Sequence, residues 1–159
     1  MDLIASLFFF MVIIISMLWL WETAHRHMTD YRDLNARQTR LMDVSSMLVK
    51  TQGNPPDWEN GDVTPANVKA LGLAAEGNVL DERKLDALEA ADYQSLREIM
   101  GFGSENFTIT VAENYSGAPV VKHSAGAGGA TGERFITRRY ALLNGTPVEL
   151  KIEAYYNRR

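Results

Sequence analysis

The chain opens with an unbroken apolar stretch. Residues 3–21 are 19 consecutive positions without a charge, and Asp2 is the one charged residue ahead of them. As an α-helix this stretch is about 28 Å long, which matches the hydrocarbon core of a membrane. Trp19 and Trp21 at its far end are typical of an interfacial aromatic belt. The pattern therefore predicts a membrane-spanning helix over residues 3–21.

The helical pattern continues beyond the apolar stretch. No Gly or Pro occurs before Gly53, and a stripe of mostly apolar residues recurs at spacings of three and four among charged positions. The stripe comprises Tyr31, Leu34, Gln38, Leu41, Ser45 and Leu48. We therefore expect one long helix over residues 1–51, apolar all round in 3–21 and amphipathic in 22–50. The two prolines that follow Gly53 end it.

Residues 52–159 predict a globular head, whose first part carries short helices within 64–100. Three sites have residues that favour helix starts and stops. They are Thr64 and Pro65 before Gly72, Asp81 before Leu85 and Leu88, and Asp92 before Gly101.

Apolar and polar positions then alternate, which predicts a β-sheet over 106–156. Asn144 and Gly145 predict a two-residue hairpin turn between its last two strands. Half-polar strands indicate an antiparallel sheet with one face in water. The predicted fold class is α+β, in which the amphipathic half of the long helix packs on the other face of this sheet.

Composition narrows the function classes. The net charge is -4, and the basic residues do not cluster among aromatics, so we expect no nucleic-acid partner. The chain has no cysteine and three histidines, so thiolate metal sites and cysteine nucleophiles are excluded and a histidine-rich metal centre is not expected. His123 stands alone in the sequence. We expect no cofactor, no metal and no enzymatic activity.

The residues around the apolar stretch also bear on targeting and on membrane orientation. The start lacks Lys and Arg, and the apolar stretch ends in bulky residues, so a cleaved secretory signal peptide is not expected. The nearest basic residues, from Arg26 onward, all follow the apolar stretch. The positive-inside rule alone would place them in the cytoplasm. A short basic leader removed after insertion would reverse this orientation.

Three N-glycosylation sequons fall in the strand region, at Asn106, Asn114 and Asn144. They predict an extracytoplasmic, glycosylated surface. At Asn144 the tight turn and Pro147 compete with modification.

The layout resembles the type IV pilin superfamily, and within it the archaeal pilin-like proteins with class III signal peptides. The similarity covers most of the chain. The segments that carry it are LVKTQGNPPDWE (48–59), VKALGLA (68–74) and VLDERKLDALEAADYQSLREIMGF (79–102). The resemblance implies a structural subunit of an extracellular filament, used for adhesion or surface attachment, that resides in the cytoplasmic membrane before assembly.

The resemblance also implies partners and roles. A prepilin peptidase would remove a basic leader, and an assembly ATPase and a membrane platform protein would draw the subunit into a helical homo-oligomer. Asp2 would neutralise the N-terminus of a neighbouring subunit, although pilins commonly carry the acid at the fifth mature position. The filament core would be packed by apolar residues of the first helix: Leu3, Ile4, Leu7, Phe8, Phe9, Phe10, Ile14, Leu18, Trp19 and Trp21.

Two alternatives remain open. The chain could be a minor pilin or pseudopilin, at a filament tip or in a secretion-like pseudopilus. It could also be a single-pass membrane protein with an extracytoplasmic binding domain.

Overall fold

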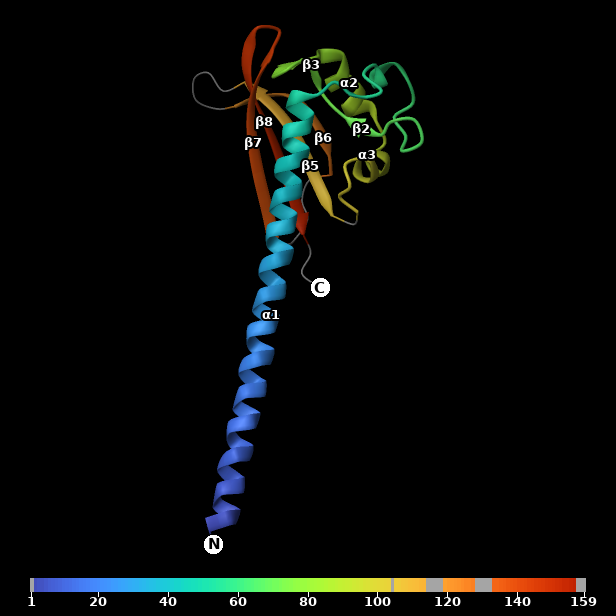
Figure 1. Ribbon diagram of the computed structural model, residues 1–159. Coiled ribbons are helices and arrows are strands. Elements are labelled where there is room, and N and C mark those ends of the chain that lie inside the picture. The colour runs from blue at the N-terminus through green and yellow to red at the C-terminus, as the bar shows by residue number, and fades with distance from the viewer. Residues whose placement is uncertain (1, 104, 114–118, 128–132, 157–159) are drawn as a thin grey trace. The chain divides into compact units, whose positions relative to one another are not determined.

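The computed structural model describes residues 2–103, 105–113, 119–127 and 133–156. In the first helix it describes the backbone alone at positions 2, 26–31 and 33. That helix, α1, spans Asp2–Lys50. The chain divides into two compact units, residues 1–39 and 40–159. The α+β class, with a long N-terminal helix followed by a largely antiparallel sheet and short helices, is confirmed (Figure 1).

The last turns of α1 belong to the second unit and supply part of its core. They contribute Leu41, Val44, Leu48 and Val49, which pack in one cluster with residues of the sheet and the short helices. Ser45 is also buried here, and its hydroxyl donates to the carbonyl oxygen of Met42 at 2.8 Å. Among the described side chains of the expected stripe, those from Leu41 onward are buried, whereas Leu34 is half-buried and Gln38 is exposed. The side chain of Tyr31 lies outside the described residues.

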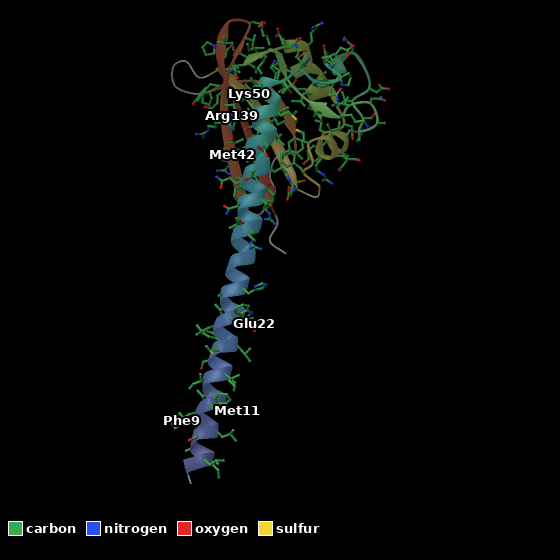
Figure 2. The ribbon with its side chains drawn as sticks, in the orientation of Figure 1. Phe9, Met11, Glu22, Met42, Lys50 and Arg139 are labelled. Atoms are coloured by element: carbon green, nitrogen blue, oxygen red, sulfur yellow. The ribbon has the colours of Figure 1, made fainter. Side chains whose placement is uncertain are left out.

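A polar contact also joins α1 to the sheet within the second unit. The Nη2 of Arg139 donates to the hydroxyl of Ser46 at 3.1 Å, and Figure 2 shows Arg139 beside this part of the helix. The amphipathic end of α1 is therefore held on the sheet by both apolar packing and a hydrogen bond.

The sheet has six strands in the order β3-β4-β7-β8-β5-β6. They span Ala74–Glu76 (β3), Val79–Leu80 (β4), Asn106–Glu113 (β5), Val120–Gly126 (β6), Glu133–Leu143 (β7) and Thr146–Tyr156 (β8). Neighbours pair antiparallel, with one exception: β4 runs parallel to the end of β7, which the sequence did not predict. Alternate residues of β5 and β8 are buried, so one face of the sheet lies on the core and the other on solvent.

The hairpin expected between β7 and β8 is confirmed. Asn144 and Gly145 have φ angles of 52° and 79°, the left-handed values that a two-residue turn of type I′ requires. Asn and Gly adopt this conformation at little cost. The turn fixes the register in which Leu143 faces Thr146.

Two of the three expected short helices are present. Helix α2 (Glu82–Ala90) begins at Asp81, whose carboxylate accepts from the amide of Arg83 at 3.0 Å. Helix α3 (Tyr93–Ile99) begins at Asp92, whose carboxylate accepts from the amide of Ser95 at 2.9 Å. Both N-caps satisfy amides that would otherwise lack a partner.

The helix expected from Thr64 to Gly72 is wrong. That segment forms turns and then strand β2 (Ala70–Leu71), which pairs with β1 (Gly53–Asn54) directly after α1. A short 3₁₀ helix, η1 (Trp58–Asn60), lies between these two strands in sequence. Only one turn of the segment bonds to itself, where the amides of Asn67 and Val68 donate to the carbonyl of Thr64. The amide of Lys69 then donates to the carbonyl of Asn54 in β1 at 2.8 Å.

Candidate functional site

The apolar half of α1 is the most unusual surface of the chain. Leu3–His25, all described, form a 23-residue segment with a mean hydropathy of 2.7, long and apolar enough to cross a membrane, and no residue of its most apolar window is buried. The large apolar residues expected to pack a filament core are exposed by between 37% (Ile14) and 81% (Leu3). In Figure 2, Phe9 and Met11 project from the helix. An apolar surface of this extent indicates a site covered by lipid or by other protein.

Two hydroxyls within the segment are already satisfied. The hydroxyl of Ser16 donates to the carbonyl oxygen of Val12 at 2.8 Å, and that of Thr23 to the carbonyl oxygen of Trp19 at 2.9 Å. Each hydroxyl thus bonds to its own helix, four residues back. Neither hydroxyl needs water or a partner chain, so the helix can enter a fully apolar environment without losing these bonds.

Aromatic residues lie in both halves of the segment. Phe8 and Phe9 form an edge-on pair with ring centroids 6.2 Å apart. Trp19 and Trp21 are 67% and 75% exposed. Exposed tryptophans near the end of an apolar helix are what an interfacial aromatic belt requires. Their belt role stays a prediction.

Asp2 is the first residue of α1. A carboxylate there would lie at the favourable end of the helix dipole. Its expected pairing with a neighbouring N-terminus rests on a side chain outside the described residues.

The three sequons lie in different surroundings. The Nδ2 of Asn144, the atom that would carry a glycan, donates to a carboxylate oxygen of Glu82 at 2.8 Å. Asn106 is half-buried at the start of β5, and its Oδ1 accepts from the hydroxyl of Tyr93 at 3.2 Å. Asn114 lies outside the described residues. Glycosylation at these sites stays a prediction.

His123, which stands alone in the sequence, lies close to two carboxylates in the structure. Its Nδ1 lies 3.4 Å from a carboxylate oxygen of Glu89 and 3.8 Å from one of Asp86, both on α2. The carboxylate of Glu89 also accepts from the amide of Ser124 on β6. These contacts join α2 to β6, an edge strand of the sheet. Among the described residues, no group of three His, Cys, Asp or Glu side chains has a geometry that could hold a metal ion.

Polar side chains cover the solvent face of the sheet. Arg138 on β7 pairs with Glu149 on β8 at 3.2 Å, and Arg134 with Glu153 at 3.7 Å. Lys151 shares Glu153, at 3.4 Å. The alternation in the sequence marks these positions as outward, but the cross-strand register that brings them together depends on the hairpin turn and could not be derived from composition.

Hydrogen bonds to charged partners shift three pKa values in the second unit. The side-chain hydrogen bond from Arg83 lowers the pKa of Asp81, against a smaller opposing effect of burial, and the same bond raises the pKa of Arg83. The hydrogen bond from the Tyr155 hydroxyl to the Glu153 carboxylate raises the pKa of Tyr155. All three groups lie outside the apolar segment.

A shallow hollow lies on the same face of the sheet. Its volume is about 240 Å³, and it is lined by Ala112, Pro119, Arg138, Glu149 and Lys151. The sequence alone does not group these residues, because only the pairing register of β5, β7 and β8 brings them together.

Comparison of the chain with protein-family models, with curated proteins and with solved structures finds no match.

Proposed function

We propose that this chain is a structural subunit of an extracellular filament of the archaeal type IV pilus kind, assembled through its N-terminal helix. The observation that carries the proposal is the fully exposed apolar segment Leu3–His25, continuous in one helix with turns that belong to a separately packed unit. The subunit itself performs no chemistry.

Two environments satisfy such a helix. Burying one large apolar side chain contributes about 1.5–3 kcal/mol, so leaving a dozen or more in water is strongly unfavourable. Lipid covers them before assembly, and the helices of other subunits cover them in the filament core. Because both surroundings are apolar, transfer between them costs little hydrophobic free energy, and close packing among helices favours the filament.

The second unit would form the outer surface of the filament. Its core lies within residues 41–156, so it does not depend on the apolar segment for its own packing. In this proposal a prepilin peptidase, an assembly ATPase and a membrane platform protein act on the subunit, and its place is the cytoplasmic membrane before assembly and the cell surface afterwards.

The test introduces a charge into the apolar helix. In the source cell, Phe9→Asp is expected to leave the protein in the membrane, since one carboxylate at mid-helix costs about 3 kcal/mol of insertion, yet to abolish filaments seen by electron microscopy. Asp2→Ala is expected to have the same effect on filaments. Asn35→Asp is the matched control, because it adds the same charge at an exposed position outside the apolar segment.

Filaments of normal number and length from both Phe9→Asp and Asp2→Ala would overturn the proposal. N-terminal sequencing of the native protein adds an independent result, since the proposal expects a processed N-terminus. The amount of this chain in purified filaments distinguishes a main subunit from a minor pilin at a tip or in a pseudopilus.

The hollow on the sheet favours a second candidate function. A single-pass membrane protein with an extracytoplasmic binding domain would use the same apolar segment as an anchor and the sheet face as its site. That candidate predicts an unprocessed N-terminus and no helical assembly of the purified protein.

A further inference from the structure

The hollow exists because a small residue lies among large ones. Ala112 on β5 faces Glu149 on β8 on one side and Val121 on β6 on the other. A methyl group at this position cannot fill the space between its longer neighbours, so a depression of about 240 Å³ remains, with Ala112 among its lining residues. Every residue of the hollow lies in the second unit.

Positive charge is in excess around the hollow. Arg138 and Lys151 lie directly opposite each other on β7 and β8. Like charges in this arrangement destabilise a sheet unless a negative group lies between them. Glu149 is the one acidic residue of the lining, and it contacts Arg138 through Nε at 3.2 Å. Lys151 also lies 3.4 Å from a carboxylate oxygen of Glu153, but Glu153 pairs with Arg134 as well. Three cations against two carboxylates leave this network with one positive charge in excess.

An exposed aromatic ring stands next to this charge. Tyr140 lies two residues beyond Arg138 on the same strand face and directly opposite Glu149, and it is 72% exposed. A tyrosine left in solvent beside charged hydrogen-bonding groups offers both an apolar ring face and a polar tip. Val121, 55% exposed, adds apolar surface on the other side.

We propose that the hollow binds a carboxylate-bearing sugar residue, such as a hexuronate of an acidic polysaccharide. The carboxylate lies between the guanidinium of Arg138 and the ammonium of Lys151 and supplies the missing negative charge. The carboxylate of Glu149 accepts hydrogen bonds from ring hydroxyls, and the C–H face of the sugar packs on Tyr140. The volume suits one six-membered ring, and the open face admits a chain extending from it.

This site does not rest on the proposed filament. None of its residues belongs to the apolar segment, so a monomeric protein should bind the sugar. Loss of filaments and loss of sugar binding are therefore separable results.

The experiment measures binding to the full chain in phosphatidylcholine nanodiscs, whose headgroups carry no sugar. Saturation-transfer NMR compares glucuronate with glucose, which lacks the carboxylate, and with acetate, which lacks the ring. We expect a millimolar dissociation constant for glucuronate, the range that about a dozen non-hydrogen atoms support. Glucose and acetate are each expected to bind at least about tenfold more weakly, because each lacks one set of contacts.

Variants test the residues. Arg138→Gln and Lys151→Gln are each expected to weaken glucuronate binding about tenfold or more, since each removes a charge-assisted contact. Ala112→Val fills the hollow without changing a charge and is expected to weaken binding to a similar degree. Lys122→Gln is the matched control, because Lys122 also pairs with a glutamate of a neighbouring strand, Glu113 at 3.4 Å, but neither lines the hollow nor shares a carboxylate with Arg138 or Lys151.

Circular dichroism of each variant establishes that the sheet is intact. Equal binding of acetate and glucuronate would overturn the sugar assignment, and so would equal binding of glucose. No detectable glucuronate binding at tens of millimolar, or an equal loss in Lys122→Gln and Arg138→Gln, would overturn the site.

Discussion

The Nζ of Lys84 donates to the carbonyl oxygen of Gln52 at 2.6 Å, so a buried ammonium in α2 holds the chain directly after α1. A second bond, to the carbonyl oxygen of Pro56 at 2.7 Å, holds the loop that follows. Nearby, the indole of Trp58 donates to the carbonyl oxygen of Gly72 at 2.9 Å. These contacts explain how a stretch with only short elements of regular structure, from Gln52 to Gly72, is kept in one conformation on the core.

Lys84→Met is expected to destabilise the second unit by about 2–4 kcal/mol, because two charge-assisted hydrogen bonds are lost while the apolar stem is preserved. Urea denaturation followed by Trp58 fluorescence measures this, in a background with Trp19 and Trp21 replaced by Phe. Lys69→Met is the control: Lys69 is exposed and bonds only locally, to the carbonyl of Pro65, so its loss should cost less than about 0.5 kcal/mol. Equal effects of the two substitutions would show that the buried ammonium does not hold the loop.

Gly72→Ala is expected to destabilise the second unit by about 3 kcal/mol or more. A Cβ at this position would overlap the carbonyl oxygen of Thr51 and the amide nitrogen of Gly53, and backbone atoms cannot move aside as a flexible side chain can. Gly61→Ala tests the same change where no atom lies within 4 Å of the new methyl group. The free energy of unfolding should therefore change little in Gly61→Ala, and a similar change in both variants would contradict the close approach.

The segment around Gly72 shows where sequence reasoning failed. Thr64, Pro65 and Gly72 have the composition of a helix start and stop, and local preference alone predicts a helix there. The end of the segment instead pairs with the chain that follows α1: the amide of Lys69 donates to the carbonyl of Asn54 at 2.8 Å, and Leu71 in β2 lies opposite Gly53 in β1. Contacts between segments far apart in sequence thus outweigh a local preference. Such contacts leave no periodic pattern in the sequence.

Helices α2 and α3 show the opposite case. Asp81 and Asp92 determine their starts through side-chain bonds that span only two or three residues, so the sequence is sufficient to predict them. The turn at Asn144 and Gly145 is local as well. The apolar segment could be predicted as a candidate site for the same reason. The hollow could not, since Ala112, Arg138 and Lys151 meet only through strand register.

The ionised form of Asp81 should stabilise the second unit in a pH-dependent way. The hydrogen bond from Arg83 lowers the folded-state pKa of Asp81 below its ordinary 3.8. The gain is therefore fully present above that ordinary value and is lost as pH falls through the lower folded pKa. Because the ion pair is near the surface, the gain is expected to be about 1 kcal/mol or less.

Asp81→Asn measures this gain, because the amide oxygen can still cap α2 but carries no charge. The difference in unfolding free energy from wild type should be present at pH 7 and should vanish at low pH. In Asp81→Ala the cap is lost too, at a cost of about 1 kcal/mol, so part of its difference should persist in acid. A difference for Asp81→Asn that stays constant or grows as pH falls would contradict the assigned cause.

The division of α1 between two units predicts how the chain can be shortened. Residues 36–159 keep one helical turn ahead of Arg40 and every residue of the core, so this fragment should fold in water without lipid or detergent. Residues 51–159 lack four core side chains of α1, namely Leu41, Val44, Leu48 and Val49. Their burial contributes about 6–12 kcal/mol, comparable to the about 5–15 kcal/mol of net stability of a whole domain. The shorter fragment should therefore be unfolded.

Circular dichroism and amide hydrogen exchange of the two fragments give the result directly. In the longer fragment, amides of β5 and β8 should be protected, because these strands lie at the centre of the sheet and pair on both sides. If the shorter fragment showed the same protection, the end of α1 would be dispensable to the core. If neither fragment folded, the apolar segment would be needed for folding as well as for assembly, and the two units could not be treated as separate.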